Sequence, residues 1–314
     1  MKKNYYNLSQ INDNLINNPR KQILDTESRY RGQLYVIADR IVADKELKLV
    51  LMAGPSCAGK TTSARLLKEI LEKMGKDVVT ISLDDFFVDR AKTPLLPSGE
   101  KDFDSPKAID TELMNECFTE LFTGRKTGFP RFDFITGKSI KNDHELEAKY
   151  NTIIIFEGLH VLNPLITSSL GTSKYFKIYV NADTGFKYKK EKIETIELRL
   201  IRRMIRDISR RNYSLGHTVK TWETVCDAEK KYISKYRKTC DAIIDTTHEF
   251  ELGILRSEME KLQNERDINF VGVKALRFVL NAEKVDKKML PQTTLMWEFV
   301  DPPKPDEFDN IENV

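Results

Sequence analysis

The sequence lacks the features that would mark a membrane protein, a disulfide-rich scaffold or a zinc site. Its 314 residues contain no apolar stretch of about 18 residues, the length that a membrane-spanning helix needs. The first residues, MKKNYYN, lack the apolar centre of a secretory signal peptide. The four cysteines form no CxxC pair, and the four histidines show no metal-ligand spacing. These absences predict a soluble, cytoplasmic protein with reduced thiols.

An excess of one charge is also missing. The chain has 51 basic and 48 acidic residues, and this balance does not favour a dedicated nucleic-acid-binding or membrane-surface protein. With 40% hydrophobic residues, the chain is long enough to bury the core of one large domain with appendages. We therefore expect neither a membrane nor a nucleic acid as partner; a homo-oligomer stays an open alternative.

One motif stands out among the features that are present. Residues 54–61, GPSCAGKT, match the P-loop pattern GxxxxGK[ST]. An apolar run at 47–53 precedes the motif as a buried strand, and a helical pattern starts at Thr62. The backbone N–H groups of such a loop and of the following helix N-terminus converge on one concavity that binds phosphate. The motif predicts that the chain binds a nucleoside triphosphate.

Within this loop, Lys60 is expected to reach the β- and γ-phosphates and Thr61 to offer its hydroxyl to Mg²⁺. A chance Gly-rich turn before a helix is the alternative, and the buried strand ahead of the motif disfavours it. The nucleotide-binding residues predicted for the loop are Gly54, Ser56, Cys57, Ala58, Gly59, Lys60, Thr61 and Thr62.

Apolar runs along the chain predict the fold class. Helical patterns lie between most of these runs, and the alternation indicates an α/β fold with a mainly parallel five-stranded sheet covered by helices on both faces. A hairpin or extended loop is expected at 129–139 and a helical region at 250–282. The predicted strands are 47–53, 78–83, 151–156, 175–180 and 242–244.

The same patterns divide the chain into three parts. Residues 1–46 are expected to be an N-terminal extension, Asn-rich and poorly ordered to about residue 20 and helical after it. Residues 47–282 are expected to form the P-loop domain. Residues 283–314 are expected to be a C-terminal segment, which from Asp301 onward becomes a Pro-rich and then acidic tail.

Carboxylates follow two of the predicted strands. Asp84 and Asp85 end the strand at 78–83, and Glu157 ends the strand at 151–156. In an open parallel sheet, ligands bind beyond the carboxyl ends of the strands. Phosphoryl transfer to an alcohol needs a metal near the phosphates and a carboxylate that orients or deprotonates the hydroxyl. Asp84 and Glu157 are placed to supply these, although acidic residues also end strands as turn formers or helix caps.

Arginines also recur at helical spacing. Five of them lie on one predicted helix face with Asp207 as the only acidic neighbour in sequence, so they would repel one another unless an anion or other carboxylates faced them. Arg suits forked contacts with phosphate oxygens. Salt bridges to a neighbouring helix or an RNA-contacting strip are the alternatives. The arginines are Arg199, Arg202, Arg203, Arg206 and Arg210.

These motifs together resemble the uridine kinase/phosphoribulokinase family, in the family's order, over about residues 48–245. The chain is most similar to the uridine kinase-like domains that many bacteria carry behind a TGS domain, and its end, 290–299, resembles the end of that subgroup. Besides the P-loop, the segments that carry the likeness are SLDDFF at 82–87, DFDSPKAID at 102–110, PRFDF at 130–134, FEG at 156–158 and RLIRRMIRD at 199–207.

The resemblance implies a P-loop kinase that uses ATP and Mg²⁺ to phosphorylate a small-molecule hydroxyl, with a nucleoside 5′-hydroxyl as the preferred acceptor. A non-nucleoside sugar or small alcohol, or a nucleotide-binding regulator with little turnover, are the alternatives. Asp84 matches the general base and, with Thr61 and Glu157, the metal-associated positions. Asp104 matches a carboxylate that holds the ribose hydroxyls.

The arginine helix matches a lid at about 195–215 that closes over the triphosphate and excludes water. The resemblance assigns catalytic roles to Asp84, Lys60, Arg202 and Arg206, nucleotide contacts to Arg199 and Arg203, and substrate contacts to Asp84, Phe87, Asp104 and Phe132.

One stretch departs from the family pattern. In uridine-cytidine kinases, a Tyr and a His of the segment that matches 130–137 contact the pyrimidine. Here Phe132 and Gly137 stand at those positions, so neither offers a polar group to the base. A site discriminates strongly when it hydrogen-bonds a substrate group and weakly when it only encloses it. The departure predicts weak reading of the base by this loop.

Overall fold

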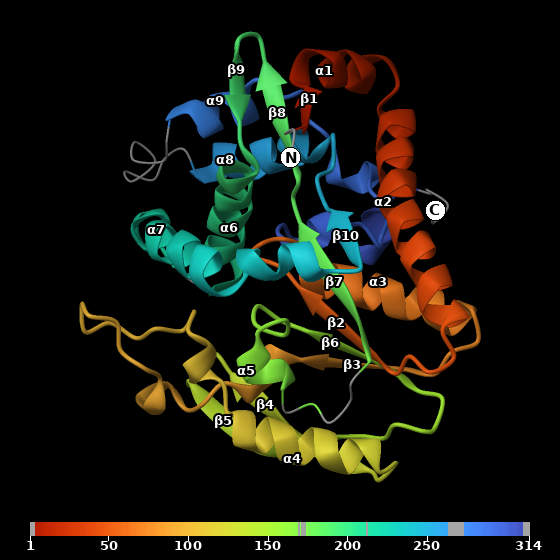
Figure 1. The fold of residues 1–314 in the computed structure, drawn as a ribbon. Helices are drawn as coiled ribbons and strands as arrows, with labels where there is room; N and C mark the ends of the chain where they lie inside the picture. The colour runs from red at the N-terminus through yellow and green to blue at the C-terminus, as the bar shows by residue number, and fades with distance from the viewer. Residues whose placement is uncertain (1–3, 169, 171–173, 212, 263–272, 310–314) are drawn as a thin grey trace.

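A parallel sheet forms the centre of the molecule (Figure 1), and the computed structural model describes residues 4–168, 170, 174–211, 213–262 and 273–309. Its strands run in the order β10-β7-β2-β6-β3, and every neighbouring pair is parallel. The predicted α/β class with five parallel strands is therefore confirmed. The strands are β2 (Leu49–Ala53), β3 (Val78–Ser82), β6 (Ile153–Glu157), β7 (Tyr175–Asn181) and β10 (Ala242–Asp245).

Both faces of the sheet are buried, because side chains along a strand alternate between two apolar clusters. In β2, Val50 and Met52 belong to one cluster, whereas Leu49 and Leu51 belong to the other. This two-sided burial explains why β2 is continuously apolar. Helices α2 (Pro19–Ala43), α3 (Lys60–Lys73) and α8 (Glu251–Leu262) contribute to the first cluster, and α4 (Thr111–Phe122) to the second.

A hairpin and further helices lie outside the five-stranded sheet. The predicted hairpin is present and longer than expected, since β4 (Thr127–Asp133) pairs with β5 (Lys138–Leu146). The expected helical region at 250–282 comprises α8 and α9 (Val273–Leu280), while residues 263–272 lie outside the described ones. The other helices are α5 (Pro164–Thr167), α6 (Thr195–Arg211) and α7 (Leu215–Tyr232), of which α6 and α7 pack together.

The N-terminal extension is ordered from residue 4, so the expectation that residues up to about 20 lack order is wrong. Strand β1 (Asn4–Asn7) pairs with β8 (Thr184–Tyr188), which also pairs with β9 (Glu191–Ile193). The side chains of Asn7 and Asn18 cap helix α1 (Leu8–Asn17) and α2 respectively. The asparagines therefore mark helix starts, a role for which their side-chain oxygens are suited.

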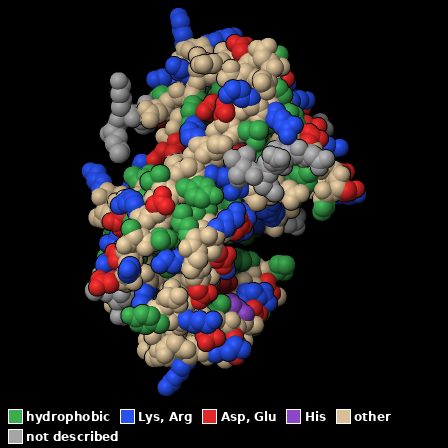
Figure 2. Space-filling view, turned by 90° about the vertical axis from the view of Figure 1, so that its right-hand side faces the viewer, with side chains coloured by type: hydrophobic (Ala, Val, Ile, Leu, Met, Phe, Trp, Pro, Cys, Tyr) green, Lys and Arg blue, Asp and Glu red, His purple; other side chains and the backbone are tan. Residues whose placement is uncertain are grey.

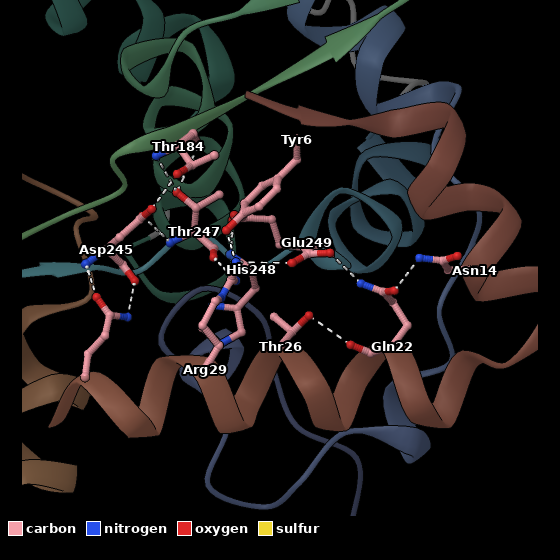
Figure 3. Close-up of polar contacts among 12 residues, drawn as sticks. Tyr6, Asn14, Gln22, Thr26, Arg29, Thr184, Asp245, Thr247, His248 and Glu249 are labelled. Carbon is pink, nitrogen blue, oxygen red and sulfur yellow. Dashed lines mark hydrogen bonds and ion pairs between the residues drawn. The ribbon is translucent and has the colours of Figure 1, made fainter. Parts of the chain in front are cut away.

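Helix α2 is attached to the end of β10 by polar contacts (Figure 3). Arg29 donates to the Thr247 carbonyl at 3.1 Å and forms an ion pair with Glu249, also at 3.1 Å. Gln33 accepts from the Asp245 amide at 2.9 Å and donates to the carbonyl of the same residue at 3.0 Å. The extension thereby fixes the loop that follows β10.

The C-terminal segment contributes to the first core cluster up to residue 300. Leu290, Leu295 and Phe299 are at most 1% exposed. Thr293 accepts a hydrogen bond from Arg31 of α2, and Thr294 donates one to Glu27 of the same helix. The expected tail from Asp301 onward is mostly exposed as far as residue 309, the last one described.

Charges of both signs are interspersed over the surface that faces the viewer in Figure 2, without a large patch of one sign. The same view shows a notch at its right-hand edge, between the upper and lower parts of the molecule. Among the described residues, no helix is long and apolar enough to cross a membrane.

Candidate active site

The P-loop lies between β2, the middle strand of the sheet, and the N-terminus of α3. Cys57 and Gly59 have φ values of +57° and +91°, which turn the chain so that the following amides form the first turn of α3. At Gly59 a Cβ atom would lie 2.6 Å from the Leu295 side chain, so the position requires glycine for space as well as for conformation. The Lys60 ammonium donates to the Pro55 carbonyl at 3.1 Å and therefore folds back over the loop.

Glu157 is the buried carboxylate beside this loop. It accepts hydrogen bonds from Thr61 Oγ1 at 3.3 Å and from Ser82 Oγ at 3.1 Å, so this carboxylate joins the start of α3 to the end of β3. Burial raises the pKa of Glu157 to about 7; the Lys60 charge opposes this rise and the Asp84 charge adds to it. A carboxylate whose charge is disfavoured by burial is suited to bind a cation.

The oxygens near Glu157 fit Mg²⁺ better than a transition metal. A hydroxyl and carboxylates are the hard ligands that Mg²⁺ prefers, usually one or two carboxylates together with substrate phosphates and water. The described residues contain no group of three or more His, Cys, Asp or Glu that would form a complete protein cage. The predicted ligands Thr61, Asp84 and Glu157 suit a metal shared with a nucleotide, and their role stays a prediction.

Asp84 and Asp85 lie in a short 3₁₀ turn, Leu83–Phe86, directly after β3. The Asp84 amide hydrogen-bonds the Ser82 hydroxyl at 3.3 Å, so the same serine contacts both Asp84 and Glu157. Burial raises the pKa of Asp85, and the neighbouring Asp84 charge contributes to the rise. The Ser82 hydroxyl thus links the Glu157 carboxylate to the backbone of the turn that carries Asp84.

Asp104 faces the arginine helix from the loop before α4. Burial raises the pKa of Asp104, whereas the charges of Arg203 and Arg211 lower it, so both guanidinium groups act on this carboxylate. His160, which follows Glu157 closely in sequence, is 2% exposed, and burial lowers its pKa to about 4. The His160 ring lies beside the Asp104 backbone, which opposes the fall of the His160 pKa.

Phe87 and Phe132 are brought together, as their shared assignment to the acceptor requires. Their ring centroids lie 5.5 Å apart, and Phe134 packs against both at 6.2 and 5.0 Å. Phe132 is 5% exposed, so its ring is mostly covered by protein. A polar group on this ring would enter an aromatic cluster.

Gly137 is glycine because of the hairpin turn. Its φ is +69°, and a Cβ atom there would lie 2.7–2.8 Å from the Arg90 side chain. The Gly137 carbonyl accepts from the Arg90 amide at 2.8 Å. A histidine at this position would strain the turn and clash with Arg90, so the backbone accounts for the glycine at this departure from the family pattern.

Helix α6 lies against the P-loop, but its arginines have more acidic partners than the sequence indicated. Arg199 pairs with Glu229 of α7 at 2.7 Å, and Arg202 pairs with Glu251 of α8 at 2.7 Å. Both ion pairs are largely or fully buried. For Arg199 and Arg202 the structure therefore shows the alternative of salt bridges to neighbouring helices, because their carboxylate partners come from α7 and α8.

The same arginines also contact the P-loop itself. Arg199 donates to the Ser56 carbonyl at 3.2 Å, Arg202 to the Cys57 carbonyl at 3.3 Å, and Arg203 to Ser56 Oγ at 3.2 Å. Arg203 and Arg206 pair with Asp207 at 3.2 and 2.8 Å. The structure thus brings the predicted arginines to the predicted loop, while closure of α6 as a lid stays a prediction.

Sequence reasoning missed three carboxylates of this region: Glu229, Glu251 and Glu298. Glu298 accepts a hydrogen bond from the Thr62 amide at 3.1 Å, in the first turn of α3. No local pattern marks these residues, because each contacts its partner across at least 30 positions of sequence. Only the tertiary fold brings them to the site.

A sequence model of the phosphoribulokinase/uridine kinase family matches residues 49–252. A uridine kinase of Mycoplasma genitalium is 27% identical over 211 residues, which cover 67% of this chain and 90% of the relative. A uridine kinase of Saccharomyces cerevisiae is 26% identical over 302 residues, with coverage of 86% and 55%.

Solved structures of related architecture include a possible uridine kinase from Bacillus stearothermophilus. It has a TM-score of 0.46 and 18% identity, and the match covers 68% of this chain and 98% of that one. The family match contains the P-loop, the strand-end carboxylates and the arginine helix. The N-terminal extension and residues 253–309 lie outside it.

Proposed function

Since the chain belongs to the phosphoribulokinase/uridine kinase family, we propose that it transfers the γ-phosphate of ATP to a hydroxyl group of a small molecule, with a nucleoside 5′-hydroxyl as the preferred acceptor. The observation that carries the proposal is the meeting of the P-loop, Glu157 and Asp84 at the ends of three adjacent strands. Uridine kinases among the relatives support the nucleoside acceptor.

In this reaction the P-loop amides and Lys60 would hold the triphosphate. Asp84 would accept the proton of the attacking hydroxyl, and Asp104 would hold further hydroxyl groups of the acceptor. Thr61, Asp84 and Glu157 would hold Mg²⁺, which would neutralise charge on the phosphates. Arg203 and Arg206, which are less deeply buried than Arg202, would turn from Asp207 toward the transferring phosphoryl group.

A non-nucleoside alcohol is the second candidate acceptor, and the β4–β5 hairpin supports this candidate. Phe132 is covered by other aromatic rings and Gly137 is required by its turn, so neither position reads a base by hydrogen bonding. His160 and Asp104 are polar groups close to each other near the expected acceptor position, and they would suit hydroxyl groups of any sugar. A nucleotide-binding regulator with little turnover is the alternative outside the enzymes.

An ADP-release assay with a panel of nucleosides, sugars and sugar phosphates tests the proposal. We expect acceptor-dependent ADP release with at least one nucleoside, and loss of both release and ATP binding in Lys60→Ala. ADP release with a sugar alone would assign the second candidate. Tight ATP binding without release for any acceptor would favour the regulator.

A further inference from the structure

Residues 290–300, the buried part of the C-terminal segment, cover the P-loop. They lie outside the region that matches the family. Leu295 lies against Gly59, where it fills the space that a side chain would need. Leu295, Met296, Phe299 and Val300 are at most 1% exposed. Burial of four apolar side chains fixes the backbone of this segment in place.

Arginines of α6 hold the same segment. Arg210 donates to the carbonyls of Trp297, Glu298 and Val300 at 2.6, 3.1 and 3.1 Å. The Arg202 guanidinium lies 4.7 Å from the centre of the Phe299 ring. These contacts hold residues 290–300 beside the phosphate-binding loop, and this segment carries Glu298.

Glu298 occupies an anion position of the P-loop. Its carboxylate accepts from the Thr62 amide at 3.1 Å, one of the α3 donors that have no partner inside the helix. The first turn of α3 contains no acidic residue, and its N-cap Gly59 supplies no side-chain cap. In a P-loop, amides at this helix start bind nucleotide phosphates. After burial and the Asp84 charge, the Glu298 charge also contributes to the raised pKa of Glu157, so Glu298 acts on the same site.

We propose that Glu298 is an internal phosphate mimic that a nucleotide must displace. The inference rests on the proposed nucleotide site. In the nucleotide-free protein the carboxylate satisfies the Thr62 amide and the positive end of α3. On binding, a phosphate of the nucleotide takes this position, and the Glu298 side chain turns away while the buried backbone of 290–300 stays in place.

This exchange gives Glu298 opposite effects on two measurable quantities. It stabilises the nucleotide-free fold, because it caps α3 with a charge-assisted hydrogen bond. It weakens nucleotide binding, because the same bond must be broken and the like charge moved away. If Glu298 had a structural role alone, its substitution would lower both the stability of the fold and the affinity for nucleotide. If Glu298 contacted the nucleotide directly, its substitution would lower the affinity.

The test compares Glu298→Gln with Glu307→Gln, a change in the exposed tail at a residue that caps only its own 3₁₀ turn. Urea unfolding of the nucleotide-free proteins and calorimetric titration with ATP, without acceptor, are measured for both variants and the unchanged chain. We expect Glu298→Gln to unfold at lower urea concentration and to bind ATP about tenfold more tightly, with Glu307→Gln unchanged. Inorganic tripolyphosphate should gain similarly, whereas adenosine, which lacks phosphate, should not.

Equal or weaker ATP binding by Glu298→Gln would overturn the inference while leaving the nucleotide site intact. Failure of all three proteins to bind ATP would overturn the proposed function and the inference with it. If Glu298→Gln does not fold, Glu298→Asp decides between the outcomes by the same two measurements, since it withdraws the charge from Thr62 by one methylene.

Discussion

Glu157 has a measurable influence on how the stability of the metal-free protein depends on pH. Burial raises the pKa of Glu157 from 4.5 to about 7, so the folded protein retains a proton that the unfolded chain has lost in this pH window. The free energy of unfolding therefore falls as pH rises through the window, and the loss is complete above pH about 7. Since one pKa unit corresponds to about 1.4 kcal/mol, the rise of the Glu157 pKa lowers the free energy of unfolding by about 3 kcal/mol.

Glu157→Gln should remove this loss, because the amide can accept the same hydrogen bonds from Thr61 and Ser82 without a charge. The variant should match the unchanged protein near pH 4.5 and exceed its unfolding free energy by about 3 kcal/mol at pH 8. Urea unfolding with EDTA at several pH values measures this difference. Glu72→Gln, at an exposed carboxylate, is the control. A stability difference that does not change with pH would refute the reasoning.

Three further predictions concern the base, the buried ion pair and the hairpin turn. Asp84→Asn should lower turnover by at least about 10²-fold with ATP still bound, and near-normal turnover would contradict its role as the base. Arg202→Met or Glu251→Gln alone should each cost about 3–5 kcal/mol of unfolding free energy, because each leaves a buried charge unpaired; a double variant that costs the sum would refute this coupling. Gly137→Ala should destabilise the protein more than Gly99→Ala in thermal unfolding, since both have positive φ but only Gly137 contacts Arg90; equal effects would contradict the contact.

The sequence was informative where the determinants of structure are local. Residues 49–53 and 153–156 are continuous apolar runs, and the P-loop motif comprises eight consecutive residues. The N-terminal asparagines misled because the same residue type marks disorder by composition and helix starts by position. Only the capping geometry separates the two.

The partners of the arginine helix were not predictable for a different reason. Glu229 and Glu251 pair with Arg199 and Arg202 from other helices, and their positions in sequence carry no periodic relation to α6. Composition predicted only the tail from Asp301 onward, and nothing in it indicated that Leu295 and Phe299, just before the tail, are fully buried. Composition averaged over a terminus conceals such short apolar anchors.

The contacts of α2 with residues 293 and 294 have a consequence for the order of folding during synthesis. Glu27 and Arg31 emerge from the ribosome more than 260 positions before their partners Thr294 and Thr293. The strands of the sheet can pair earlier, whereas the contacts of α2 with residues 293 and 294 form only after residue 294 has been synthesised. Contacts of such long sequence separation also form slowly. Until residues 290–300 pack in place, the P-loop beside Gly59 stays uncovered. The nascent chain therefore exposes its phosphate-binding loop before this segment covers it.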